Sequence, residues 1–144
     1  MLEINLHQQA LEYLNQVLGK DAVRVKPSRI QADLPYFLQD AYELAAIEMF
    51  GHEVTLACTK GLQALPAQQI EQHVRRMREQ LNTPLIVAFQ QVAAGERKQL
   101  IEHGVAFVVP GRQLYAPQLG VILSERFGLP ARREQAQVSP ATQA

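Results

Sequence analysis

Residues 84–121 read PLIVAFQQVAAGERKQLIEHGVAFVVPGRQLYAPQLGV, and this stretch decides the expected fold. Its two apolar runs, 85–89 and 105–109, are typical of strands that are buried on both faces of a sheet. The segment between them, 95–103, is expected to be a short helix that ends at Gly104, because glycine adopts the left-handed conformation without a steric penalty. A strand–helix–strand unit of this kind needs cover on both faces of its sheet.

The end of the same stretch predicts a hairpin. Pro110 and Gly111 are a strong turn signal, and residues 113–115 are expected to pair back on the preceding strand. We interpret this hairpin as exposed, with Leu114 and Tyr115 near an edge of the sheet. Because a sheet edge invites pairing with another chain, we expect a homodimer in which this edge, or the arginine-bearing helix described below, takes part.

The chain before this stretch predicts further elements of the same sheet. Residues 5–19 have apolar side chains at helical spacing, with Asn5 as the N-cap. Residues 23–25 indicate a short edge strand. The runs 42–50 and 53–59 flank a glycine and predict a hairpin, and the alternating pattern of the second run predicts a half-buried strand.

Residues 66–82 give the clearest helical pattern, with a proline at the first helical position and apolar residues every three or four positions. The predicted order is helix, strand, hairpin, helix, strand, helix, hairpin. This order indicates one α/β domain over residues 1–128, with a mixed sheet flanked by helices. Residues 129–144 have almost no large apolar side chains and are expected to be a polar linker or a disordered tail.

The composition limits the class of protein. The chain has 144 residues, 47% of them hydrophobic, which is enough for one domain with a core. Lys and Arg number 14, as do Asp and Glu, so the net charge is zero and a surface that grips nucleic acid throughout is not expected. Cys58 is the single cysteine, so no internal disulfide can form. Because neither a signal peptide nor a membrane span is visible, we expect a cytoplasmic protein with no membrane partner.

The order helix, three strands, helix, strand resembles the core of restriction-endonuclease-like nucleases. That family holds a divalent metal with a carboxylate on the second strand and an acid-x-Lys pair on the third, since hard cations need oxygen ligands. Lys60 could match the lysine, but the acid position is then Cys58. Glu53 lies too early in the strand, and neither Glu43 nor Glu48 completes a motif. We therefore expect no catalytic residues, no metal site and no cofactor.

Other catalytic signatures are weaker still. Cys58 alternates with apolar residues and is expected to lie in the core. No glycine-rich phosphate loop is present. The histidines are not in a metal-ligand spacing and are expected to face solvent on helices and turns. These histidines are His7, His52, His73 and His103.

One basic cluster stands out. It consists of Arg75, Arg76 and Arg78 and could be joined by Arg97 and Lys98. A solvated helix face is the simpler interpretation, because neighbouring glutamates dilute the charge, and contact with phosphates is the alternative. The candidate residues for contact with nucleic acid or a partner are Arg75, Arg76, Arg78, Arg97, Lys98, Arg112 and Tyr115.

Residues 84–123 carry a family resemblance. The strand after Pro84, the segment ERKQLIEHGVAF at 96–107 and the phrase VPGRQLYAP at 109–117 look like the N-terminal domain of bacterial regulators that have a MarR-type winged helix-turn-helix at the C-terminus. Residues 138–144 look like the lead into that second domain. The resemblance implies transcription regulation, with duplex DNA bound by a C-terminal winged helix that this chain does not contain.

Three functions remain open at this point. The leading expectation is a non-enzymatic regulatory or interaction domain of a DNA-binding transcription regulator with an inactive restriction-endonuclease-like core. The alternatives are a metal-dependent nuclease or nuclease remnant, and a scaffold or toxin–antitoxin-type partner. The arginine-bearing helix is expected to bury its apolar stripe in the core, so it is not free to enter a DNA groove. Residues 1–144 are therefore expected to bind duplex DNA weakly and without sequence preference.

Overall fold

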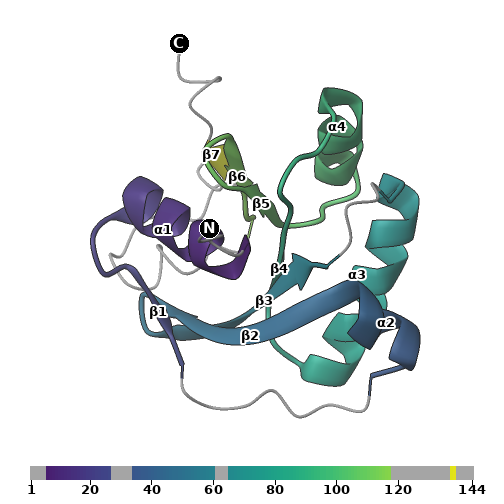
Figure 1. Ribbon diagram of the computed structural model, residues 1–144, viewed down its shortest axis with the longest axis horizontal. Coiled ribbons are helices and arrows are strands. Elements are labelled where there is room, and N and C mark those ends of the chain that lie inside the picture. Colours follow the sequence, from purple (N-terminus) through teal and green to yellow (C-terminus); the bar gives the residue numbers. More distant parts are fainter. Residues whose placement is uncertain (1–5, 27–33, 61–64, 118–136, 139–144) are drawn as a thin grey trace, which may run out of the picture.

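The computed structural model describes residues 6–26, 34–60, 65–117 and 137–138, which form an α/β domain with one mixed sheet (Figure 1). The helices of these residues are α1 Leu6–Leu18, α2 Tyr36–Ala41, α3 Ala67–Leu81 and α4 Ala94–Glu102. The strands are β1 Val23–Val25, β2 Tyr42–Met49, β3 His52–Thr59, β4 Leu85–Ala88, β5 Phe107–Val109, β6 Gln113–Tyr115 and β7 Gln137–Val138. The α/β class expected from the sequence is confirmed.

The strands lie side by side in chain order, from β1 to β7. The central strands β3, β4 and β5 are parallel, and the pairs on either side of them are antiparallel. This pattern follows from the connections. Helices α3 and α4 carry the chain back between parallel strands, whereas short turns join β2 to β3 and β5 to β6, as antiparallel neighbours allow.

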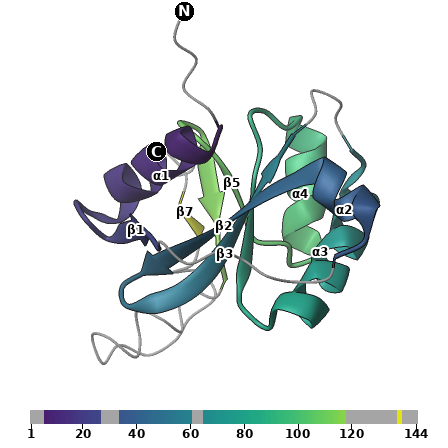
Figure 2. The same cartoon turned by 60° about the horizontal axis from the view of Figure 1, so that its bottom comes forward.

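Helices cover the sheet from both sides (Figure 2). Helix α1 packs on one face through Leu6, Ala10, Tyr13 and Leu14, which contact a core that includes Ile86 and Val108. Helices α2, α3 and α4 pack on the other face around a second core. Its largest fully buried side chains include Leu38, Ile70, Met77, Leu100 and Phe107. The central strands are therefore buried on both faces, as their apolar runs predict.

Several predicted boundaries are confirmed, including the edge strand β1, the hairpin of β2 and β3, and the helix end at Gly104, which has φ +72°. Three details differ. The short helix α2 follows Pro35 and was not expected. Pro66 is the N-cap of α3 rather than its first helical residue. Strand β3 is not half buried, because α3 and its neighbours cover the face that holds Thr55 and Ala57, which are 3% and 0% exposed.

The predicted hairpin forms, and its turn is exposed at Gly111 and Arg112, but strand β6 is largely buried and is not an edge. Gln113 and Leu114 are 6% and 0% exposed. On its far side β6 pairs with β7, in the register Leu114 to Val138 and Tyr115 to Gln137. Two residues of the predicted polar tail thus belong to the sheet, while the rest of 129–144, and Asn5 as the predicted N-cap, lie outside the described residues.

Candidate functional site

The carboxyl end of β3 is where a restriction-endonuclease-like core would place its metal ligands. Glu43 on β2 lies directly across from Cys58 on β3. The Cys58 thiol is buried, and burial, together with the negative charge of Glu43, raises its pKa to about 12. A protonated thiol of this kind offers a hard cation no oxygen ligand.

Lys60, the residue that matches the lysine of the nuclease motif, is engaged at the end of α2. Its Nζ donates a hydrogen bond of 2.8 Å to the backbone oxygen of Gln39. Its backbone N–H donates to the oxygen of Ala41 at 2.9 Å. Because the C-terminal carbonyls of a helix carry partial negative charge, this ammonium stabilises the end of α2.

The described residues contain no group of three or more His, Cys, Asp or Glu side chains that could hold a metal ion. The prediction that the histidines face solvent is wrong for His73, which is 8% exposed. Position 73 falls on the inner face of α3, where Nδ1 lies 2.9 Å from the hydroxyl of Tyr42. Burial lowers the pKa of His73, so its ring is neutral and packs as part of the core.

The three predicted arginines of α3 are exposed, but they point into two different hollows. Arg75 and Arg78 line a groove beside the connection from α4 to β5. Arg75 and Arg76 line a second hollow of about 650 Å³, which also contains Phe37 and His73. The cluster predicted from the sequence is therefore a row along α3 that faces two directions.

The remaining predicted contact residues do not join this row. Arg97 is half buried, and its Nη1 lies 3.4 Å from Oε1 of Gln113 on β6. Lys98 is exposed on α4, and Arg112 is exposed in the β5–β6 turn. Tyr115 is half buried, with its ring 6.1 Å from that of Phe107. Neither of the two hollows beside α3 is lined by any of these side chains.

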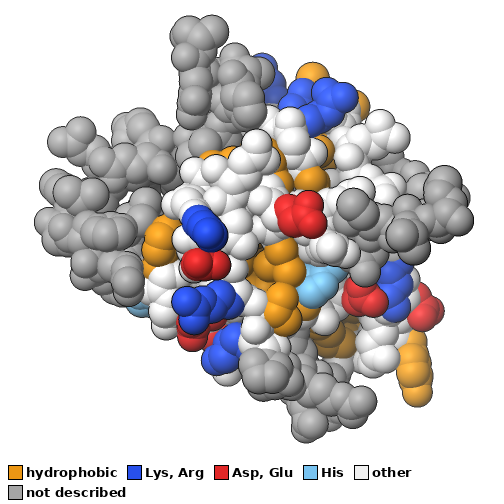
Figure 3. Space-filling view, turned by 60° about the vertical axis from the view of Figure 1, so that its left-hand side comes forward, with side chains coloured by type: hydrophobic (Ala, Val, Ile, Leu, Met, Phe, Trp, Pro, Cys, Tyr) orange, Lys and Arg blue, Asp and Glu red, His pale blue; other side chains and the backbone are white. Residues whose placement is uncertain are grey.

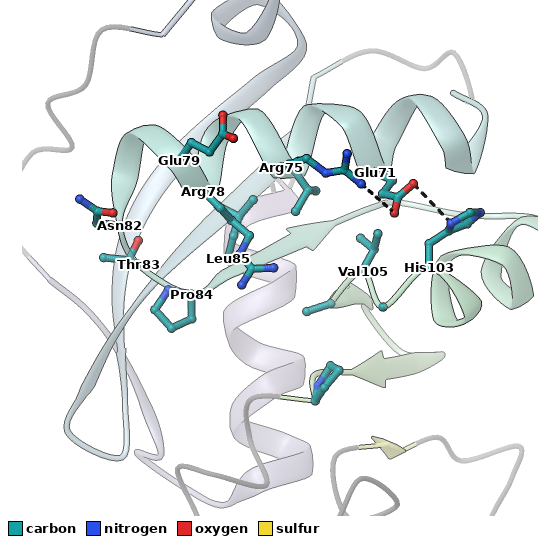
Figure 4. A pocket seen from close by; sticks show the side chains of 14 residues that line it. Glu71, Arg75, Arg78, Glu79, Asn82, Thr83, Pro84, Leu85, His103 and Val105 are labelled. Atoms are coloured by element: carbon teal, nitrogen blue, oxygen red, sulfur yellow. Dashed lines mark hydrogen bonds and ion pairs between the residues drawn. The ribbon is translucent and has the colours of Figure 1, made fainter.

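The first groove is drawn from close by in Figure 4. It has a volume of about 830 Å³ and lies between α3 and the segment that leads from α4 into β5. Its polar wall is formed by Glu71, Arg75, Arg78, Glu79, Asn82, Thr83 and His103, and its apolar wall by Val74, Pro84, Leu85, Val105, Ala106 and Pro117, with Gly104 between them.

Glu71 organises one end of this groove. Its Oε2 lies 3.5 Å from Nη2 of Arg75, and its Oε1 lies 3.3 Å from Nδ1 of His103. Figure 4 shows the Arg75 side chain turned toward Glu71, whereas that of Arg78 extends into the groove. The spacing of four residues between Glu71 and Arg75 is visible in the sequence, but the approach of His103 comes from tertiary packing.

Two exposed aromatic residues were missed by the sequence analysis. Tyr36 and Phe37 are 83% and 53% exposed at the start of α2. The Phe37 ring lies 5.6 Å from the ring of His73 and borders the second hollow. No periodicity marks these residues, because α2 is too short to show one.

The comparisons with known proteins give no relative for this chain: no family model matches it, and neither do curated proteins or solved structures. Within the described part of the chain, moreover, none of the helices has the length and apolar character needed to cross a bilayer.

Proposed function

We propose that this domain is a non-enzymatic regulatory and interaction domain of a cytoplasmic DNA-binding transcription regulator. Specific contact with duplex DNA is assigned to a winged helix C-terminal to the domain, as the resemblance of residues 84–123 implies. The observation that carries the non-enzymatic part of the proposal is Cys58. It stands where a nuclease of this architecture needs a carboxylate, and its thiol is buried.

The chemistry around Cys58 supports this assignment. Magnesium is bound through oxygen ligands, usually with one or two carboxylates. Glu43 supplies one carboxylate beside Cys58, and the Lys60 ammonium is hydrogen-bonded to Gln39. A metal bound here would lack its second acidic ligand, and the water on that metal would lack a free lysine.

The distribution of charge supports weak intrinsic DNA binding. On the face drawn in Figure 3, basic and acidic side chains lie next to one another instead of forming a continuous basic patch. On α3, Arg75 pairs with Glu71, and Glu79 follows Arg78 by one position. Because affinity for DNA grows with the number of phosphates that are neutralised, these arginines act at most as auxiliary phosphate contacts.

The DNA-binding part is tested by titrating a labelled fragment of the native upstream region with two proteins. One is residues 1–144, and the other carries the following winged helix in addition. We expect weak, salt-sensitive binding without sequence preference from the first protein and specific binding from the second. Tight, sequence-selective binding by residues 1–144 near physiological salt would place the DNA-reading surface on this domain and contradict the proposal.

A nuclease or nuclease remnant is the second candidate. The observation that favours it is the position of Glu43, an exposed carboxylate directly opposite Cys58 and at the same end of the sheet as Lys60. A metal site in which one acid had been replaced would leave such an arrangement. It supports a remnant more than a working enzyme.

A homodimer is part of the proposal, with α3 as the contributing element. The β6 edge no longer supports it, because β7 covers that strand. Helix α3 exposes Arg75, Arg76 and Arg78. Helix α2, which packs on the same face of the sheet, exposes Tyr36 and Phe37. Light scattering after size exclusion at high protein concentration tests the dimer, and a monomeric mass contradicts it.

A further inference from the structure

The groove beside α3 has the size and lining of a small-molecule site. Its volume of about 830 Å³ falls in the range of ligand pockets, which combine apolar walls with a few convergent polar groups. The apolar wall comes from three elements that are distant in the sequence: Val74 on α3, Leu85 at the start of β4, and Val105 before β5. All three side chains are anchored in the second core, so the wall is rigid.

The charged side chain that extends into this groove is unpaired. Within the described part of the chain, the Arg78 guanidinium makes no ion pair and no side-chain hydrogen bond. Arg75 lies one turn earlier on the same helix, but Glu71 already partners it at 3.5 Å. Arg78 therefore has all of its guanidinium donors free, and a guanidinium binds a carboxylate through two parallel hydrogen bonds.

The charges around Arg78 disfavour a purely inorganic anion as the ligand of this groove. Arg78 and Asn82 lie at the C-terminal end of α3, where the backbone carbonyls carry partial negative charge. Glu71 and Glu79, which both line the groove, add two full negative charges. Binding by charge alone is thus opposed, and the apolar wall must contribute through the burial of apolar ligand surface.

We propose that this groove binds a small organic anion, with its carboxylate on Arg78 and its apolar body against Val74, Leu85 and Val105. The ligand class goes beyond the regulatory role proposed above and does not depend on it. Glu71 opposes the ligand, because its negative charge lines the groove and its ion pair with Arg75 at 3.5 Å competes with the carboxylate for that guanidinium.

The test is an NMR titration of the full 144-residue chain labelled with ¹⁵N. The probes are benzoate, phenylacetate and hexanoate, the neutral amide of each, and inorganic phosphate. We expect saturable shifts of the backbone amides of Leu85 and Val105 with at least one carboxylate. The matching amide and phosphate should bind at least about tenfold more weakly, since a hydrogen bond to a charged group accounts for about 10- to 100-fold in affinity.

Substitutions at three charged residues of α3 distinguish this site from a structural groove. Arg78→Gln should weaken carboxylate binding about 10- to 100-fold. Glu71→Gln should tighten it, because it removes an opposing charge and releases Arg75. Arg76→Gln is the matched control: it lies on the same helix, outside the groove, and should leave binding unchanged. Superimposable spectra of the free variants show that each one folds.

Arg78→Gln and Glu71→Gln are expected to change the carboxylate affinity in opposite directions, so the outcome is decisive. The proposal is overturned if no carboxylate of the panel shifts the groove amides, or if the neutral amides bind equally well. It is also overturned if Arg76→Gln weakens binding as much as Arg78→Gln, or if Glu71→Gln fails to tighten it. Because no DNA is present, failure here leaves the test of DNA binding untouched.

Discussion

The hydroxyl of Tyr42 lies 2.9 Å from Nδ1 of His73, and both side chains are buried. This contact joins β2 to the inner face of α3, with the two rings edge to face at 5.6 Å. Burial lowers the pKa of His73 and raises that of Tyr42, so both groups are neutral and the hydroxyl can donate to the ring nitrogen. The packing of α3 on the sheet therefore depends on an uncharged histidine.

The first prediction concerns pH. In the unfolded chain His73 takes up a proton near its ordinary pKa of 6.5, whereas the folded protein protonates it only at lower pH. Its contribution to stability is fully present above pH 6.5 and is lost as the pH falls below that value. Urea unfolding at pH 7.5, 6.5 and 5.5 should show that the free energy of unfolding falls more steeply with decreasing pH for the wild type than for His73→Gln. Equal slopes would contradict the role of His73.

The second prediction concerns the hydrogen bond itself. Tyr42→Phe leaves the buried Nδ1 of His73 without its donor and should lower the free energy of unfolding by about 1–3 kcal/mol at pH 7.5. Tyr115→Phe removes a hydroxyl from a half-buried ring and serves as the control, with an expected change within about 0.5 kcal/mol. Urea denaturation measures both. The contact would carry no stability if the two variants were equally stable.

The third prediction concerns the link between α4 and α3. Oε2 of Glu96 accepts a hydrogen bond of 2.8 Å from the backbone N–H of Ala67, the first residue of α3. No side-chain cap is present at Pro66, so this carboxylate takes the part of a capping residue at the positive end of the helix. Glu96→Ala should cost about 0.5–2 kcal/mol of stability.

Glu102→Ala is the control for Glu96, because Glu102 is exposed at the other end of α4. It should change the free energy of unfolding by no more than about 0.5 kcal/mol. Thermal and urea unfolding give both values. If Glu102→Ala lowered the free energy of unfolding as much as Glu96→Ala, the loss of stability would come from α4 and not from the cap on α3.

The fourth prediction concerns Cys58. Because burial raises the pKa of its thiol to about 12, almost no thiolate exists at pH 8. A thiol reagent such as iodoacetamide should leave the folded protein unmodified at that pH and should label one site after unfolding in urea. Mass spectrometry of both samples measures the labelling. Rapid stoichiometric labelling of the folded protein would mean that the thiol is accessible and ionised.

The fifth prediction concerns catalysis. The domain should not cleave supercoiled plasmid DNA in the presence of magnesium or manganese, because Cys58 replaces the acid that a metal site needs. Lys60→Ala should behave like the wild type in this assay, since the Lys60 ammonium contacts the end of α2. Metal-dependent cleavage that disappears in Lys60→Ala would establish the nuclease alternative.

Local sequence patterns were sufficient for most of the elements. The buried runs that became β4 and β5, and the apolar stripe of α3, predict their structures because burial on one or two faces dictates the spacing of apolar residues. The turn at Gly111 and the helix end at Gly104 follow from positive φ angles of +79° and +72°, which favour glycine.

The candidate site depended on information that no local pattern contains. The arginines of α3 were visible as a row, but the free donors of Arg78 are identified only once Glu71 is seen to hold both Arg75 and His103. His103 approaches from another helix, so nothing in its neighbourhood in the sequence marks the pairing. For the same reason Arg97, which is close to Lys98 in sequence, contacts Gln113 instead of joining the cluster.

The sequence by itself determined the α/β class, the order of the main helices and strands, and the absence of an acid before Lys60, because these depend on residue type and short-range periodicity. Only the tertiary structure decided that β7 covers β6, that His73 is buried against Tyr42, and that Glu96 caps α3. Each of these contacts joins elements that are distant in the chain. Their formation depends on how the helices pack against the sheet, which periodicity does not encode.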